Sequence, residues 1–249
     1  MSVDAVVLDW GIGGFGFLWA YQRRHPDARL VYLSDSGTTP YGLLPRAALR
    51  HRLREVGAWS AARGARRLVV ACNAASSALD DSPLGVPVSG IIEAGVSLVR
   101  AGGFSRVGVI GGRRTILSRA YATPLRQLGL DVQQRVAQPL SALVEAGILQ
   151  GARVDDVLAH VLRGLRSVDA LVLACTHYPA LAERIQAHLP GVTLLDPAER
   201  LARDVPGPRV KSRAQLECCT TGDATRSREA AHVAFGRDPG EFAVLPSLS

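Results

Sequence analysis

The fold is decided by Leu68-Val69-Val70-Ala71-Cys72-Asn73 and by a second stretch, Leu171-Val172-Leu173-Ala174-Cys175-Thr176, which begins 103 positions later. Each stretch is a short apolar run that ends in a cysteine followed by a small polar residue. Short apolar runs that alternate with longer stretches of helical spacing indicate buried strands in βα units. The repetition therefore predicts an α/β fold of two related halves with mostly parallel sheets.

The surrounding sequence supports the same internal repeat. A first apolar run, Val6 to Leu8, is followed by a glycine turn at Gly11 to Gly14, and both features return at a similar offset between Val107 and Gly112. Apolar residues at helical spacing predict helices over 45–63, 115–128, 139–148 and 153–166. Each half is thus expected to alternate strands and helices.

The position of the two cysteines has a chemical consequence. In open α/β sheets, ligands bind outside the carboxyl ends of the strands, so a cysteine that directly follows a strand lies on the ligand side. If the two halves face each other, Cys72 and Cys175 look into one cleft. The positive N-terminus of the helix after each strand is expected to lower the pKa of these thiols.

Two thiols in one cleft suit racemisation or epimerisation. The reaction removes a proton from one face of a carbon and returns a proton to the other face, so it needs an acid/base group on each side. An ordinary cysteine has a pKa of about 8.5, so neighbouring groups must tune it. Asp9 is predicted to orient or activate Cys72, and His177 is predicted to do the same for Cys175.

Each of these residues also has a purely structural interpretation. A single cysteine among apolar residues is usually a small buried hydrophobe, and only the duplicated context favours catalysis at Cys72 and Cys175. His177 alone is compatible with a buried core histidine, and Asp9 is compatible with a helix cap. The turn at Gly11 to Gly14 does not match G-x-G-x-x-G, so it gives little support to a dinucleotide site.

Composition and charge narrow the class of protein. Apolar residues make up 47% of the 249 residues, and no apolar run approaches the length of a membrane span. The formal net charge is +7, but the arginines are spread along the chain, so we expect a small anionic substrate rather than nucleic acid. The N-terminus lacks the basic start of a signal peptide, and we expect a cytoplasmic protein with reduced cysteines.

The two remaining cysteines, Cys218 and Cys219, lie outside the repeat, and we interpret them as structural. No pair of cysteines in the sequence has the C-x2-C spacing of a structural zinc site, so we predict no metal.

Several short motifs carry a further resemblance. Asp9-Trp10-Gly11-Ile12-Gly13-Gly14 is similar to D-S-G-[IV]-G-G, Val70-Ala71-Cys72-Asn73-Ala74-Ala75-Ser76 to V-A-C-N-T-A-S, and Cys175-Thr176-His177-Tyr178-Pro179 is C-T-H-Y-P without a change. Shorter matches are Asp35 with Pro40-Tyr41-Gly42, Ile92-Glu93-Ala94-Gly95, Thr115 with Tyr121, Glu145 with Gly147, and Thr220-Thr221-Gly222-Asp223. Together, over nearly the whole chain, these motifs resemble the glutamate racemase group of the aspartate/glutamate racemase superfamily.

The resemblance implies a fold, a reaction and an assembly. It implies two α/β domains with the active site in the cleft between them, the first formed by 1–94 and 204–249 and the second by 95–203. It implies interconversion of L- and D-glutamate for peptidoglycan synthesis, without metal, flavin or pyridoxal phosphate, by an enzyme that forms a homodimer.

The resemblance also implies roles for individual residues. Cys72 and Cys175 become the two thiol acid/base groups. Their supporting groups are Asp9, Glu145 and His177. Three residues would hold the α-carboxylate and amino group of the substrate, namely Asn73, Thr115 and Thr176. The backbone N–H groups of Tyr41 and Gly42 would receive its side-chain carboxylate.

Two departures from the family motifs affect the substrate-binding positions. Trp10 stands where the family has serine, and Ala74 stands where it has threonine, so two hydroxyls are replaced. Losing one hydrogen bond typically costs about 0.5–1.5 kcal/mol, or more when the partner is charged. Two alternatives to glutamate racemisation therefore stay open: a two-cysteine racemase, epimerase or isomerase of another acid, and a non-catalytic regulatory protein such as a gyrase-binding relative.

Overall fold

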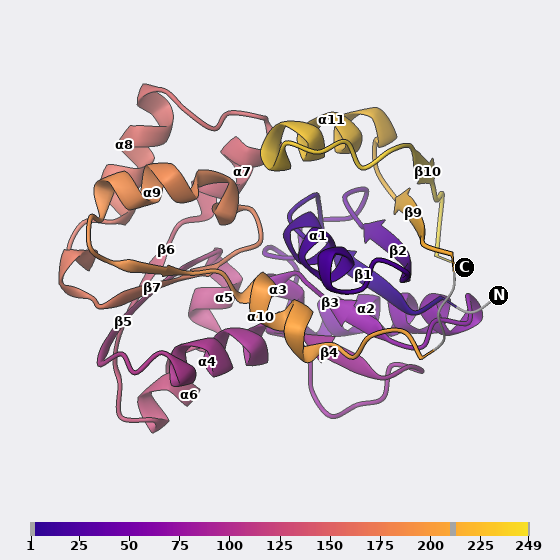
Figure 1. Ribbon diagram of the computed structural model, residues 1–249, viewed down its shortest axis with the longest axis horizontal. Coiled ribbons are helices and arrows are strands. Elements are labelled where there is room, and N and C mark those ends of the chain that lie inside the picture. The colour runs from indigo at the N-terminus through magenta and orange to yellow at the C-terminus, as the bar shows by residue number, and fades with distance from the viewer. Residues whose placement is uncertain (1–2, 210–212, 249) are drawn as a thin grey trace.

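The computed structural model describes residues 3–209 and 213–248, and it contains two β-sheets covered by helices (Figure 1). The first sheet has six strands in the order β10-β9-β2-β1-β3-β4. Its strands are β1 (Ala5–Asp9), β2 (Arg29–Ser34), β3 (Leu68–Val70), β4 (Val88–Gly90), β9 (Gln215–Thr220) and β10 (Phe242–Val244). All of its strand pairs within the described residues are parallel.

The second sheet repeats the central part of the first. Its strands are β5 (Arg106–Gly111), β6 (Asp131–Val136), β7 (Ala170–Ala174) and β8 (Thr193–Leu195), in the order β6-β5-β7-β8. This is the order β2-β1-β3-β4 of the first sheet, and its pairs are again parallel. Cys72 follows β3 and Cys175 follows β7, which are equivalent strands, so the predicted α/β fold of two related halves is confirmed.

Eleven α-helices cover the sheets in the described part of the chain. They are α1 (Phe15–Arg24), α2 (Arg46–Ala62), α3 (Asn73–Ser76), α4 (Ile91–Ala101), α5 (Arg113–Leu117), α6 (Ala122–Gln127), α7 (Gln138–Glu145), α8 (Ala152–Val161), α9 (Ala182–His188), α10 (Pro197–Asp204) and α11 (Ala224–Phe235). None of these helices has the length and apolarity needed to cross a membrane.

Two helix predictions need correction. A single helix over 115–128 is wrong, because the chain leaves α5 and re-enters a helix at α6. Between them Arg119 has a φ of 57°, a left-handed conformation that a right-handed helix cannot continue through. The helix predicted over 153–166 is too long, because α8 ends at Val161 and Gly164 follows with a φ of 81°.

Helices and a returning C-terminal segment join the two halves. In Figure 1, α10 lies between the two halves, where it packs against α1 of the first half and against α4. Helix α4 in turn contacts β7 of the second sheet. The C-terminal segment then returns to the first sheet, where β9 pairs with β2. The domain boundaries predicted after 94 and after 203 fall within α4 and α10, and they stay predictions.

The strands that carry the cysteines are buried along their whole length. Every residue of β1, β3 and β7 is buried, which suits strands of a parallel sheet covered on both faces. The apolar runs stop where polar or reactive residues begin, at Asp9, Cys72 and Cys175. Because parallel strands end at one edge of a sheet, these three side chains lie at the carboxyl edges of the two sheets.

Candidate active site

A cleft of about 310 Å³ lies where the carboxyl edges of the two sheets meet. It is lined by all twelve residues to which the sequence assigned a role: Asp9, Trp10, Tyr41, Gly42, Cys72, Asn73, Ala74, Thr115, Glu145, Cys175, Thr176 and His177. The structure therefore brings the whole predicted set into one place, with β1, β3, β5 and β7 as its supports.

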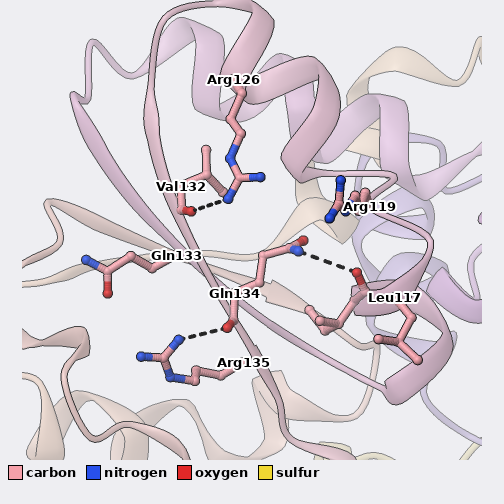
Figure 2. A pocket seen from close by; sticks show the side chains of 8 residues that line it. Leu117, Arg119, Arg126, Val132, Gln133, Gln134 and Arg135 are labelled. Carbon is pink, nitrogen blue, oxygen red and sulfur yellow. Dashed lines mark hydrogen bonds between the residues drawn. The ribbon is translucent and has the colours of Figure 1, made fainter.

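A second hollow differs from the cleft in its chemistry. It is an open depression of about 650 Å³ beside β6, lined by Ile116, Leu117, Arg119, Arg126, Val132, Gln133, Gln134 and Arg135. Figure 2 shows its arginine and glutamine side chains, three of which, Arg126, Gln134 and Arg135, donate hydrogen bonds to backbone oxygens. These lining residues include no thiol, carboxyl or imidazole group, so the cleft is the better candidate for proton transfer.

Cys72 occupies the first turn after β3, directly before the short helix α3. Burial raises the pKa of the Cys72 thiol well above its usual value, and the negative charge of Asp9 raises it further. The backbone N–H groups of Ala75 and Trp10 oppose this shift but do not outweigh it. The expectation that the helix N-terminus lowers the pKa of Cys72 is therefore wrong, because desolvation is larger than the effect of a helix of four residues.

On the other side of the cleft, Cys175 contacts His177, which in turn contacts Glu145. Its Sγ lies 3.6 Å from Nδ1 of His177, and Nε2 of His177 lies 2.5 Å from Oε1 of Glu145. Burial opposes charge on His177, but Glu145 and Cys175 together raise the pKa of His177 well above its ordinary value. The pKa of Glu145 is lowered despite its burial, mainly by His177 and by the N–H of Ile12. An imidazolium paired with a carboxylate is therefore the favoured state at neutral pH.

Hydrogen bonds across the cleft tie the two halves together. Thr176 donates its hydroxyl proton to Asp9 over 2.9 Å, and Glu145 accepts a hydrogen bond of 3.1 Å from the N–H of Ile12. Burial raises the pKa of Asp9, although His177, Gly11 and Thr176 act against this shift. A buried carboxyl with a raised pKa is suited to exchange protons nearer neutrality than an ordinary aspartate.

The glycine turn after β1 makes this close approach possible. A Cβ built on Gly11 would lie 1.9 Å from Oε1 of Glu145, and one built on Gly13 would lie 2.2 Å from Oγ1 of Thr176. Only a residue without a side chain leaves room for both contacts. The turn therefore serves the meeting of the two halves at the cleft.

Asn73 presents unpaired donors inside the cleft. Its Oδ1 accepts a hydrogen bond of 2.8 Å from the buried hydroxyl of Tyr121, and this contact fixes the orientation of the amide. Its Nδ2 is buried and has no hydrogen-bond partner among the described residues. Buried polar groups are usually paired, so an amide left open in this way is a candidate for holding a carboxylate.

Tyr41 is held by a hydrogen-bond network behind the cleft, and Gly42 follows it in the chain. The hydroxyl of Tyr41 donates to Asp35 over 2.6 Å, and Arg52 forms a two-point contact with the same carboxylate. Trp10 also lines the cleft, and its indole N–H donates over 3.1 Å to the carbonyl of Thr38. The only side-chain donor of Trp10 is thus already used, so the indole does not replace the hydroxyl of a serine.

Sequence reasoning missed several residues of the cleft, above all two cations. Arg114 enters from α5 and Arg226 from α11, and the remaining unassigned lining residues are Pro40, Gly112, Gln138, Ser141, Ala142 and Ala174. Arg113 and Arg114 are adjacent, and no periodicity distinguishes the arginine that faces the cleft. In the described part of the chain, no three His, Cys, Asp or Glu side chains gather in a way that could hold a metal ion.

Comparison with known proteins agrees with the geometry. A sequence profile of the Asp/Glu/Hydantoin racemase family matches residues 27–205. The chain belongs to this family. It is 35% identical to the glutamate racemase of Aquifex aeolicus over 204 residues, covering 80% of each protein. It is 40% identical to the glutamate racemase of a Thermus thermophilus strain over 204 residues, covering 80% of this chain and 77% of that protein.

A solved structure extends the likeness to the whole chain. The crystal structure of Thermus thermophilus glutamate racemase in complex with beta-chloro-D-alanine superposes with a TM-score of 0.86 at 32% identity, covering 98% of this chain and 97% of that one. The two-lobed α/β architecture is thus that of a racemase family. The protein is an isomerase of the racemase class.

Proposed function

We propose that this racemase interconverts L- and D-glutamate by transferring protons at the α-carbon between Cys72 and Cys175. The observation that carries the proposal is that two thiols on equivalent strands line one cleft, each with its own set of ionisable neighbours. General acid–base catalysis requires such a group on each face of the carbon that is inverted. We propose glutamate as the substrate because the similar proteins are glutamate racemases.

The two thiols have different roles at the start of a turnover. The raised pKa of Cys72 keeps this residue as a thiol, ready to donate a proton. On the other side, a protonated His177 stabilises a thiolate on Cys175 by charge and by hydrogen bonding. The Cys175 thiolate removes the α-proton, and the Cys72 thiol then protonates the carbanion on the opposite face.

The reaction leaves the protons redistributed between the thiols. After inversion Cys175 carries the proton taken from the substrate, and Cys72 is a thiolate. The reverse reaction begins from that state with the two roles exchanged. Asp9 beside Cys72 and the His177–Glu145 pair beside Cys175 assist the return of protons to the starting arrangement.

The polar groups of the cleft orient the substrate for this transfer. The open Nδ2 of Asn73 would hold the α-carboxylate, with Thr115 and Thr176 completing contacts to the α-carboxylate and amino group. The N–H groups of Tyr41 and Gly42 would receive the side-chain carboxylate. Supply of D-glutamate for peptidoglycan is the cellular role that we propose, and a homodimer is the assembly; both rest on the resemblance to glutamate racemases.

The test is optical inversion of glutamate by the purified protein. We expect circular dichroism to show conversion of L-glutamate and of D-glutamate to the same mixture, with loss of at least about a hundredfold in kcat for Cys72→Ser and for Cys175→Ser. The matched control is Cys219→Ser, because Cys219 is a buried thiol of β9 that does not line the cleft. Folded wild-type protein that leaves both enantiomers unchanged would contradict the proposal.

A second candidate keeps the two thiols and changes the substrate. Trp10 and Ala74 line the cleft where the family motif has hydroxyl residues, so an acid other than glutamate would meet different contacts there. If this candidate is correct, Trp10→Ser combined with Ala74→Thr raises glutamate turnover. Unchanged turnover in the folded double variant would speak against it.

A further inference from the structure

Arg114 is a cation of the cleft that has no acidic partner among the described residues. It is half-buried and lines the cleft together with Trp10, Tyr41 and Ala74. Within residues 3–209 and 213–248, it forms no ion pair with an aspartate or glutamate. The pKa of Arg114 is lowered by burial and by the like charge of Arg46, and no carboxylate contributes to the shift. A negatively charged ligand beside the guanidinium would offset both the burial of this charge and its repulsion by Arg46.

The acids of the cleft are not available to neutralise this charge. Asp9 is engaged by Thr176 and Gly11, and Glu145 is engaged by His177 and Ile12. The other arginine of the cleft, Arg226, acts on Glu145, whose pKa it lowers, and His177 is paired with the same carboxylate. Among the charged groups of the cleft, Arg114 is therefore the one whose charge no described acidic side chain balances.

The guanidinium of Arg114 lies beside the segment expected to receive the side-chain carboxylate of the substrate. Its Nε donates to the carbonyl of Tyr41 over 3.0 Å, and its Nη2 donates to the carbonyl of Leu44. These contacts use two of the five N–H donors of a guanidinium, and Nη1 has no hydrogen-bond partner among residues 3–209 and 213–248. The positive charge thus sits next to the segment that carries the backbone N–H groups of Tyr41 and Gly42.

The same region has lost other ways to bind an anion. The indole N–H of Trp10 is bonded to Thr38, and Ala74 has no hydroxyl to offer. A guanidinium interacts with a carboxylate more strongly than a hydroxyl does, because its hydrogen bonds are assisted by charge. Arg114 therefore offers a charge-assisted contact that neither Trp10 nor Ala74 can supply.

We infer that Arg114 is a specificity-determining residue, which selects substrates that carry a distal carboxylate. The inference deepens the proposed function and rests on it for the position of the α-carbon. Arg114 binds the distal carboxylate through its free N–H groups, and through Tyr41 and Leu44 it holds the segment that completes the anion site.

The experiment measures binding and turnover in Arg114→Met and in Arg113→Met. Arg113 precedes Arg114 on α5 but is exposed and does not line the cleft, so its variant removes the same charge at a control position. Calorimetry compares glutarate with its monoamide, in which one carboxylate is replaced by a neutral amide. We expect Arg114→Met to weaken glutarate binding about tenfold to a hundredfold and to leave the monoamide little changed, with KM for glutamate rising more than kcat falls. Arg113→Met should leave the binding affinity for both ligands unchanged.

The outcomes separate this inference from the proposed function. Equal weakening of glutarate and its monoamide in Arg114→Met would show that Arg114 only holds the 41–44 segment, and it would overturn the inference even if glutamate is inverted. Selective loss of glutarate binding in a protein that does not invert glutamate would uphold the inference and contradict the proposed function. Failure of the wild type to bind any dicarboxylate would overturn both.

Discussion

At the residue scale, the proposed proton transfer depends on how His177 is charged. His177 and Glu145 form a buried pair, and the pair raises the pKa of His177 and lowers that of Glu145. The raised pKa of His177 contributes stability that is complete below its unfolded pKa of about 6.5 and is lost as pH rises through the folded value. The lowered pKa of Glu145 contributes stability above about 4.3 that is lost as pH falls through its folded value.

These signs give a prediction for His177→Asn. The difference in unfolding free energy between wild type and this variant should be largest between about pH 4.3 and about pH 6.5. It should shrink as pH falls below about 4.3 toward the folded pKa of Glu145, and as pH rises above about 6.5 toward the folded pKa of His177. Urea denaturation at a series of pH values measures it. His51→Asn is the control, because His51 is exposed where it faces Glu55. A difference that keeps growing above neutral pH and shows no decline would contradict the charged pair.

A second residue-scale prediction concerns the orientation of Asn73. Tyr121→Phe removes the hydroxyl that fixes the amide, so the open Nδ2 no longer points in one direction. We expect KM to rise about tenfold, with a stability loss of about 1 kcal/mol. Tyr21→Phe is the control, because it deletes a hydroxyl bonded to Pro206 outside the cleft. Equal kinetic effects in both variants would refute a specific role for Tyr121.

At the scale of elements, the turn between β1 and α1 sets the distance between the two halves. A methyl group on Gly13 would meet Thr176 at 2.2 Å and Nδ1 of His177 at 2.9 Å. A small displacement of a catalytic group can cost about a hundredfold in rate. Gly13→Ala should therefore lose about that factor in kcat/KM. In Gly16→Ala the nearest atom is 3.8 Å away, and steady-state kinetics should show little change.

The loop after β2 gives a second prediction at this scale. Asp35 is fully buried and accepts hydrogen bonds from Tyr41, Thr221 and the fork of Arg52. Removing one partner of a buried charge pair typically costs about 3–5 kcal/mol. We expect Asp35→Ala to lose about that much unfolding free energy in denaturant titrations. Asp80→Ala breaks the more exposed pair with Arg50 and should lose far less. A loss for Asp35→Ala as small as that for Asp80→Ala would contradict this account of the loop.

At the scale of the whole molecule, the sequence predicts what local pattern determines. The duplicated strand ends at Cys72 and Cys175 are visible as a repeat, and the equivalent strand order confirms the two halves. The roles of the cleft residues stay predictions, although the cleft contains all of them.

The parts that sequence reasoning missed depend on contacts between distant segments. Ile12 and Glu145 lie 133 positions apart, so neither residue signals their hydrogen bond. The pKa of Cys72 depends on the burial of its thiol in the folded chain and on the charge of Asp9, which a local helix-terminus argument leaves out. Arg114 has no repeat or motif that separates it from Arg113, and only the folded structure shows which of the two lines the cleft.

The central claim is that two different thiols serve the two faces of one carbon. Its most direct test is racemisation of L-glutamate in deuterium oxide, with mass spectrometry of both enantiomers early in the reaction. The thiol that donates exchanges its proton with solvent, whereas the thiolate that accepts takes the substrate's proton. Transfer through Cys72 and Cys175 therefore predicts that the D-glutamate formed carries deuterium at the α-carbon while the remaining L-glutamate keeps its protium. D-glutamate that retains the original protium would show that a single group moves the proton across both faces, and it would contradict the account.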